Sequence, residues 1–240
     1  MLKLDILVIS VHPDDAELGC GGTILKHIAS GKKVGIVDLT QGELGTRGSA
    51  EIRIKEAAAA ARILGLSVRE NLGLPDGFFQ NTREYQLKVI EAIRKYQPEI
   101  VITNALRDRH PDHGRANELV ETSAFLSGLR KVETYFKGEL QTEWRPALVL
   151  HFIQDYHIKP DFVVDVTAYW EKKIESIFAY GSQFHNPEWE DEPQTYISSP
   201  DFLQGIEARA IEFGKSIRVK YAEGFTSKKI LGVESLFDLL

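Results

Sequence analysis

Two short clusters of histidine and aspartate contain the side chains best suited to chemistry in this sequence. The first, HPDD, spans residues 12–15, and the second, RHPDH, spans residues 109–113. Imidazole and carboxylate groups bind zinc, and a catalytic zinc site typically has three protein ligands and leaves one position for water. A tight turn that enters a helix can point both His12 and Asp15 inward, and His113 can supply a third ligand.

The remaining members of the two clusters suit acid–base chemistry. Asp14 lies next to a proposed ligand and is placed to accept a proton from a water that the metal activates. His110 is then free to act as a general acid or as a donor to an oxyanion, with Asp112 close enough to orient its ring. Together these groups predict metal-assisted hydrolysis of an amide.

The clusters need a scaffold that brings them together, and the pattern of apolar residues predicts one. Short β-branched runs alternate with amphipathic segments of helical length, which indicates an α/β fold: a Rossmann-like, doubly wound, mostly parallel sheet with helices on both faces, forming a single domain over residues 1–240. The expected strands span 4–11, 33–40, 68–74, 99–104, 147–153 and 161–167, and the expected helices span about 17–30, 49–65, 83–98, 113–127, 168–183 and 200–219. The two clusters follow the first and fourth strands, so both are expected at the carboxyl edge of the sheet, where such folds bind ligands.

Composition limits the partners that the protein can have. The formal net charge of −6 argues against generic binding to nucleic acid or to an anionic membrane. The single cysteine, Cys20, excludes an intramolecular disulfide and suits a reducing compartment. The N-terminus does not read as a signal peptide, and no run approaches the roughly 20 apolar residues that span a bilayer. We therefore expect a cytoplasmic protein that acts on a small molecule.

Other readings of the first cluster are weaker. Taken alone, HPDD is good helix-capping chemistry, since carboxylates are favoured at a helix N-terminus. Gly19, Gly21 and Gly22 after the first strand, with Asp38 at the end of the second, suggest a dinucleotide site, but Ile24 occupies the position of the third glycine. The adjacent carboxylates would also repel a pyrophosphate. A non-catalytic metal- or sugar-binding module is a further alternative, which the presence of Asp14 disfavours.

The quoted motifs resemble a known family. HPDDAELGCGGT together with RHPDH is similar to the LmbE/PIG-L-like metal-dependent N-deacetylases, which remove acetyl groups from N-acetylglucosamine derivatives. The segments EIRIKEAAAAARILG, NLGLPDG, YGSQF and YAEGFTSKK resemble the branch that acts in bacillithiol biosynthesis, so the resemblance covers nearly the whole chain. It implies N-acetyl-α-D-glucosaminyl L-malate as the substrate and a homo-oligomer, with a hexamer as the leading expectation. Free N-acetylglucosamine or chitooligosaccharides are the alternative substrates.

The resemblance also implies roles for individual residues. His12, Asp15 and His113 would bind Zn²⁺, although other divalent ions could substitute. Asp14 would be the base, and His110 would stabilise or protonate the intermediate. Whether Asp14 alone does the acid–base work stays open.

Four further residues are candidates for substrate contact, and each has an ordinary structural alternative. Arg53 matches a family position that faces the substrate, or it pairs with Glu51 or Glu56 on its own helix. Arg109 could bind the malate carboxylate, and Asp76 could bind sugar hydroxyls or shape a turn. Arg145 resembles a position near the acyl group, or it belongs to a loop. Relatives outside the bacillithiol branch have a tyrosine near the start of the last helix; here the nearest match is Phe202, and Tyr196 is the nearest phenol. The other histidines, His27, His151, His157 and His185, are not expected to be ligands.

Overall fold

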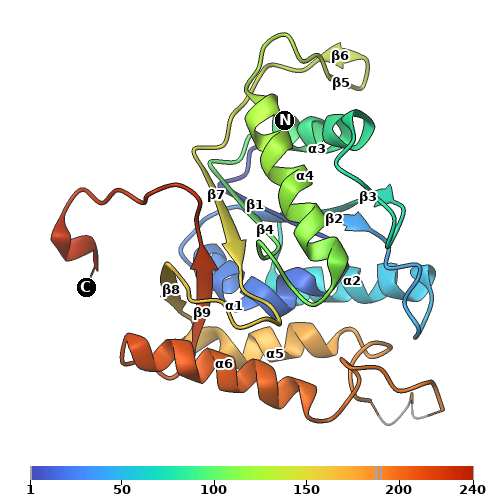
Figure 1. Cartoon of the computed structure of the whole chain (residues 1–240), viewed down its shortest axis with the longest axis vertical. Coiled ribbons are helices and arrows are strands. Elements are labelled where there is room, and N and C mark those ends of the chain that lie inside the picture. Colours follow the sequence, from blue (N-terminus) through green and yellow to red (C-terminus); the bar gives the residue numbers. More distant parts are fainter. Residues whose placement is uncertain (1, 187–188, 190, 240) are drawn as a thin grey trace.

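A seven-stranded sheet forms the centre of the computed structural model, which describes residues 2–186, 189 and 191–239 (Figure 1). The strands lie in the order β3-β2-β1-β4-β7-β9-β8, and the first five are mutually parallel. These five strands are β3 (Val68–Leu74), β2 (Val34–Thr40), β1 (Ile6–Ser10), β4 (Ile100–Thr103) and β7 (Leu148–Phe152). The predicted α/β fold with a mostly parallel sheet is confirmed.

The far edge of the sheet is antiparallel and was only partly predicted. Strand β9 (Ala222–Thr226) lies between β7 and β8 (Phe162–Asp165) and runs antiparallel to both. The sequence AEGFT of β9 gives a weak strand signal, because it contains a glycine and a charged residue. A separate two-stranded hairpin, β5 (Tyr135–Phe136) and β6 (Glu139–Leu140), was also not predicted.

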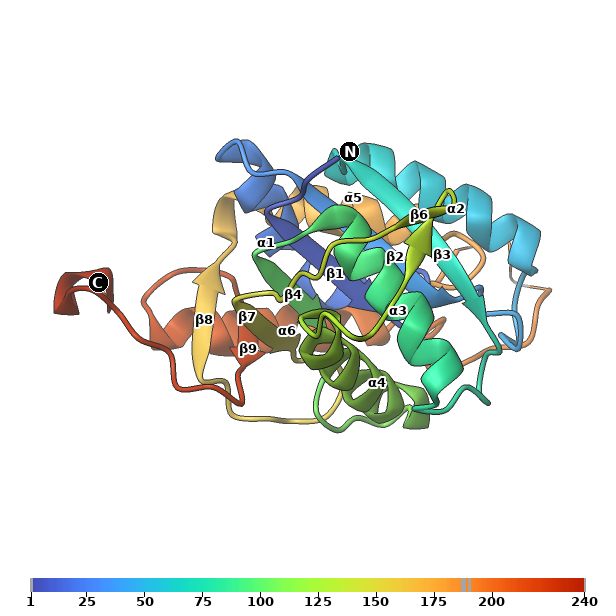
Figure 2. The ribbon, with the colours of Figure 1, turned by 90° about the horizontal axis from the view of Figure 1, so that it is seen from above.

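Helices cover both faces of the sheet (Figure 2). Alternate residues of β1 explain why: Leu7 and Ile9 pack against α3 and α4, whereas Ile6 and Val8 pack against α1 on the other face. A strand buried on both faces needs an unbroken apolar run, and this is the pattern that β1 shows. The helices are α1 (Asp15–Ala29), α2 (Ala50–Leu64), α3 (Arg83–Tyr96), α4 (Pro111–Ser127), α5 (Trp170–Phe178) and α6 (Phe202–Ser216), with short 3₁₀ helices η1 (Thr167–Tyr169) and η3 (Leu236–Leu239).

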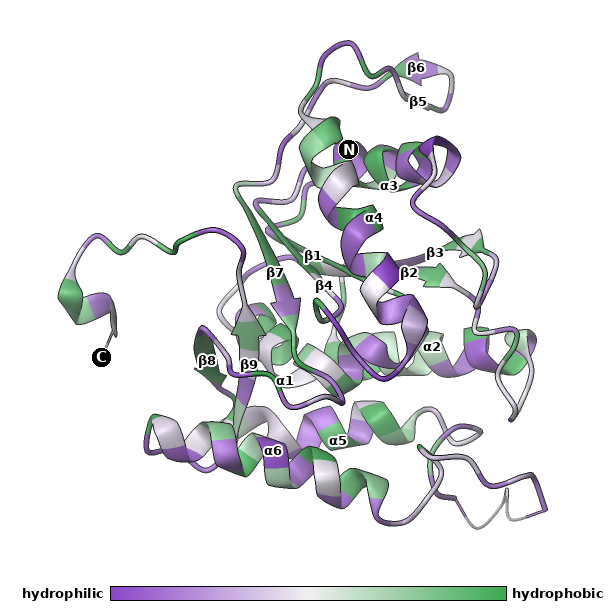
Figure 3. Ribbon diagram, viewed as in Figure 1, coloured by the Kyte–Doolittle hydropathy of each residue, from purple (hydrophilic) through white to green (hydrophobic). Residues whose placement is uncertain are grey.

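The helix boundaries follow from local capping chemistry. The hydroxyl of Ser49 accepts a hydrogen bond from the Ile52 amide at the start of α2, and Gly65 ends that helix with a φ of 78°. Helix α5 is shorter than the predicted 168–183, because its first residues form η1 and its last predicted residues form a turn. Figure 3 shows hydrophobic and hydrophilic residues alternating along α3 and α4, as expected for helices with one buried face. No helix among the described residues is long and apolar enough to cross a membrane.

The glycines of α1 allow the helix to pack unusually close to its neighbours. A Cβ atom at Gly19 would come within 2.2 Å of the Phe152 ring of β7, and one at Gly22 would come within 2.7 Å of Val166. The helix is also interrupted at Cys20, where φ is −147° and ψ is 21°. These glycines therefore serve close packing of α1.

Candidate active site

A cavity of about 480 Å³ lies beyond the carboxyl ends of β1 and β4, which are adjacent parallel strands. Because these two strands end side by side, the loops that follow them meet at one edge of the sheet, as the sequence predicted. The cavity is lined by residues from the loops after β1, β2, β3, β4 and β7 and from the segment that leads into α6. Both histidine–aspartate clusters contribute to its wall.

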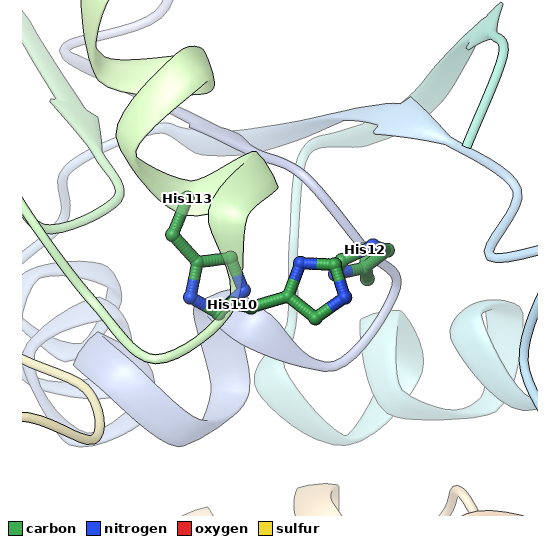
Figure 4. Close-up of side chains that lie close together, drawn as sticks. All are labelled: His12, His110 and His113. Carbon is green, nitrogen blue, oxygen red and sulfur yellow. The ribbon is translucent and has the colours of Figure 1, made fainter. Parts of the chain in front are cut away.

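Three histidines converge at the base of this cavity (Figure 4). The ring centroids of His12 and His110 lie 4.8 Å apart, those of His110 and His113 lie 5.2 Å apart, and those of His12 and His113 lie 5.7 Å apart. One nitrogen from each ring lies within 4.8 Å of the others, so the three could hold a metal ion. A second group with the same spacing consists of His12, Asp76 and Asp112.

The carboxylate of Asp15 lies between the rings of His12 and His113. Its Oδ2 is 3.6 Å from His12 Nδ1, and its Oδ1 is 3.3 Å from His113 Nε2. Asp15 also accepts hydrogen bonds from the side-chain amides of Asn104 and Gln154. Burial raises the pKa of Asp15, but the two histidines outweigh burial and hold this pKa well below its usual value. Asp15 is therefore ionised and able to bind a cation.

Each of the two outer rings is also held by a further carboxylate. His12 Nε2 lies 2.9 Å from Asp76 Oδ1, and His113 Nδ1 lies 2.6 Å from Asp108 Oδ2. This arrangement points the other nitrogen of each ring toward Asp15 and is typical of histidines that bind metal. Asp76 thus fixes His12, and its second oxygen accepts from the Leu44 amide.

The acidic surroundings of these histidines favour positive charge. Burial lowers the pKa of His12, but Asp15 and Asp76 outweigh it and raise this pKa to about 10. Burial likewise lowers the pKa of His113, while Asp15 and Asp108 raise it to about 9. A divalent cation can replace protons that carboxylates stabilise in this way, so the donor set fits a metal ion.

Asp14 occupies a strained backbone position next to this cluster. Its φ is 127°, a value that costs a non-glycine residue about 1–3 kcal/mol and is found mainly at functional sites. Its Oδ2 accepts a hydrogen bond of 2.8 Å from the Arg53 guanidinium. Burial raises the pKa of Asp14 to about 7, although Arg53 opposes the rise. A carboxylate with such a pKa is suited to exchange protons near neutral pH.

His110 lines the same cavity. Asp112 contacts its ring, as expected, but through the backbone amide and not through the carboxylate. The backbone amide of Asp112, not its carboxylate, donates to His110 Nδ1 over 3.3 Å. The Asp112 carboxylate is instead engaged by other donors, because one of its oxygens accepts from the Gly77 amide and the other from Arg115. Since Nδ1 accepts, the neutral ring carries its proton on Nε2, and burial lowers the pKa of His110. Nε2–H can then donate into the cavity.

The predicted substrate residues divide into two groups. Arg53, Asp76 and Arg109 line the cavity. Arg145 does not: its guanidinium donates to the Phe125 carbonyl and stacks 4.4 Å from the Phe125 ring, near the end of α4 opposite to His113. Arg145 was expected to contact the substrate, but it does not line the cavity that this chain forms.

Arg109 belongs to a cluster at the cavity rim that joins three loops. Its Nε donates to Asp155 Oδ2 over 3.0 Å, and its guanidinium lies 4.5 Å from the Tyr196 ring centroid. The Tyr196 hydroxyl donates to the other oxygen of Asp155 over 2.7 Å. Phe202 also lines the cavity. Asp155 was not predicted, since it lies in a loop after β7 without a recognisable motif.

The structure also identifies supporting residues that the sequence did not. Asp108, Asn104 and Gln154 all fix members of the cluster. Asn104 and Asp108 both precede the RHPDH motif, and their polar character just after β4 was the signal that could have identified them. His151 is buried and hydrogen-bonds Asn117 and Glu121 away from the cavity, as expected for a structural histidine.

Comparison with known proteins identifies relatives over most of the chain. A family model described as GlcNAc-PI de-N-acetylase (PIG-L) matches residues 7–124. The diacetylchitobiose deacetylase of Thermococcus kodakarensis is 31% identical over 229 residues, which cover 91% of this chain and 81% of that protein. The 4-oxalmesaconate hydratase of Pseudomonas putida is 28% identical, with 92% and 88% of the two chains covered. A probable N-acetyl-alpha-D-glucosaminyl L-malate deacetylase 2 of Bacillus anthracis is 28% identical, with 75% and 81% covered.

Proposed function

The chain belongs to the PIG-L family of de-N-acetylases, and from this premise we propose that it hydrolyses the N-acetyl group of an N-acetylglucosamine conjugate. It is a deacetylase of the metal-dependent type that this family represents. The observation that carries the proposal is the position of Asp14, a buried carboxylate with a pKa near neutrality, directly beside the His12–Asp15–His113 cluster.

We assign the metal ligands to His12, Asp15 and His113. In this set both histidines have their second nitrogen held by a carboxylate, whereas the second nitrogen of His110 is held by a backbone amide. Zn²⁺ is the proposed ion, and other divalent ions share its preference for these donors. When bound, the ion supplies Lewis acidity, which acidifies water and polarises the acyl oxygen.

The side chains of this chain then divide the proton transfers. Asp14 accepts a proton from the water that attacks the acetyl carbon, and Arg53 holds its carboxylate in place. His110 Nε2–H is directed into the cavity and stabilises the developing oxyanion. The C–N bond breaks as the sugar nitrogen takes a proton, which Asp14 returns. The products are acetate and a free amine.

For the group attached to the sugar we propose L-malate, as the resemblance to the bacillithiol branch implies. Two observations support an acidic conjugate: the similarity to the probable malate-conjugate deacetylase, and a guanidinium at the cavity rim, since the Arg109 side chain is 45% exposed. Carboxylate recognition by arginine is geometrically favourable.

A chitooligosaccharide such as diacetylchitobiose is the second candidate substrate. Arg53 and Arg109, the arginines that line the cavity among the described residues, are each already paired with an aspartate. A neutral second sugar would leave both ion pairs intact. The 31% identity to the diacetylchitobiose deacetylase agrees with this alternative.

Mass spectrometry tests the proposal directly. The zinc-loaded protein is incubated with the malate conjugate, diacetylchitobiose and free N-acetylglucosamine, and each product is examined for loss of an acetyl group. Deacetylation of any of these supports the proposal, and their relative rates select the conjugate. Absence of acetyl loss from all three would favour a binding module, or the hydration activity of the Pseudomonas relative. We also propose a cytoplasmic homo-oligomer, up to a hexamer, which light scattering after gel filtration would test.

A further inference from the structure

Helix α1 is interrupted in its middle by an ion pair that comes from two distant elements. In an uninterrupted helix the Gly22 amide donates to the Leu18 carbonyl, four residues earlier. Here the Leu18 carbonyl accepts from Lys173 Nζ of α5 over 2.8 Å. The Gly22 and Thr23 amides donate to the two carboxylate oxygens of Glu223, in β9, over 2.9 and 2.7 Å. The pair thus satisfies the backbone groups on both sides of the break.

Lys173 and Glu223 form a closed unit inside the protein. Lys173 Nζ lies 2.7 Å from Glu223 Oε1, and the two residues are only 2% and 4% exposed. Neither residue lines the cavity. A buried ion pair contributes little net stability, because desolvation offsets its attraction. The main effect of this ion pair is therefore the conformation that it imposes on α1.

The glycines of α1 make room for this arrangement. A Cβ atom at Gly21 would lie 3.2 Å from Lys173 Cγ, which is tighter than ordinary contact. The break itself falls at Cys20, between the carbonyl that Lys173 binds and the amides that Glu223 binds. Of the glycines that suggested a dinucleotide site, Gly22 therefore already donates its amide to a carboxylate of the protein.

The part of α1 before the break begins with a proposed metal ligand, and the proposed base directly precedes it. It begins at Asp15, directly after the strained Asp14, and it includes Leu18, whose side chain lines the cavity and whose carbonyl binds Lys173. The part after the break packs in the core through Ile24. The direction of the first part relative to the sheet is therefore set where the two parts join.

We propose that Lys173 and Glu223 are positioning residues for the active site: by holding the break in α1, they fix the direction of the turn that presents Asp14 and Asp15. This inference rests on the proposed function for its catalytic consequence. Its structural content depends only on the geometry of α1.

The double variant Lys173→Met/Glu223→Leu tests this inference. Apolar residues of similar volume can replace a buried ion pair without loss of stability, but they leave the Gly22 amide free to bond the Leu18 carbonyl. We expect a nearly unchanged melting temperature, zinc binding about 10- to 100-fold weaker, and kcat lower by about a hundredfold with little change in KM. Amide hydrogen exchange at residues 15–19 should change, because the helix closes.

Lys95→Met/Glu70→Leu provides the matched control, since this ion pair joins α3 to β3 away from the cavity. It should leave zinc affinity and kcat at the wild-type level. The inference would be overturned if the Lys173/Glu223 double variant had the same zinc affinity, kcat and amide hydrogen exchange as the wild type.

If the double variant does not fold, Glu223→Gln replaces it, because the glutamine keeps the shape but loses one of the two acceptor oxygens. Weaker zinc binding and lower kcat are expected, and wild-type values would overturn the inference. If the wild type deacetylates none of the substrates, the proposed function fails, and zinc affinity and hydrogen exchange still decide the role of the pair.

Discussion

Arg53 and Asp14 form a buried ion pair of 2.8 Å between the first turn of α2 and the residue that precedes α1. Both side chains are only 6% exposed, and both line the cavity. A substrate role for Arg53 was one of two expectations, the other being a pair with Glu51 or Glu56. The structure pairs Arg53 with Asp14, the proposed base, in place of Glu51 or Glu56, and leaves Arg53 in the lining of the cavity.

Arg53→Ala is expected to lower kcat by about one to two orders of magnitude, because Asp14 loses the group that holds its carboxylate. Arg53→Lys should recover part of this loss, since lysine keeps the charge without the planar fork. Steady-state kinetics on protein of verified zinc content measures the effect. Arg62→Ala, on the exposed face of the same helix, is the control and should behave as wild type. Unchanged kcat in Arg53→Ala would show that the pair does not support catalysis.

Arg109→Ala distinguishes the two proposed conjugates. If Arg109 binds the malate carboxylate, its removal should raise KM for the malate conjugate by about tenfold or more and leave KM for a neutral glycoside nearly unchanged. The measurement is KM for both substrates with the same enzyme preparation. Equal effects on both would mean that Arg109 only anchors Asp155 and Tyr196 at the rim.

Gly19→Ala tests the close approach of α1 to β7. The new methyl group would lie 2.2 Å from the Phe152 ring, so we expect a loss of about 1–3 kcal/mol in the free energy of unfolding. Gly205→Ala in α6 is the control, because nothing lies within 4 Å of its Cβ position. It should stabilise the protein by about 0.5–1 kcal/mol. Urea denaturation of both variants checks the contrast, and equal stability would contradict the packing described for α1.

His151 should make stability depend on pH. Burial lowers its pKa below the usual value of 6.5, although Glu121 opposes this shift. Below pH 6.5 the unfolded chain therefore binds a proton that the folded protein resists, so the free energy of unfolding decreases as pH falls. Above that pH the contribution is fully retained. The slope between pH 5 and 7, measured by urea denaturation, should be smaller in His151→Gln than in the wild type. The exposed His157→Gln should retain the wild-type slope.

The parts of the fold that local signals determine could be predicted from the sequence. The unbroken apolar run of β1 predicts a strand that is buried on both faces. The capping residues Ser49 and Gly65 predict where α2 begins and ends. Strand β9 could not be predicted, because it contains a buried glutamate, Glu223, whose charge is compensated by Lys173 from a different element. The sequence does not show that Lys173 lies beside Glu223, because the two residues are 50 positions apart and meet only in the folded protein.

The site shows the same division. The meeting of HPDD and RHPDH was expected from their positions after two strands of one parallel sheet. The contacts of individual side chains could not be predicted in this way. Asp112 contacts the His110 ring through its backbone amide, and Arg145 stacks on Phe125 at the other end of α4. Asp108 was missed because its link to His113 depends on the turn between them.

The release of acetate tests directly whether Asp14 is the base of a metal-dependent deacetylase. Zinc-loaded wild type and Asp14→Asn, with equal zinc content, are compared on whichever N-acetylglucosamine conjugate the wild type cleaves fastest. We expect acetate release by the wild type and a rate at least about a hundredfold lower in the variant. Equal rates in the two proteins would contradict this role of Asp14.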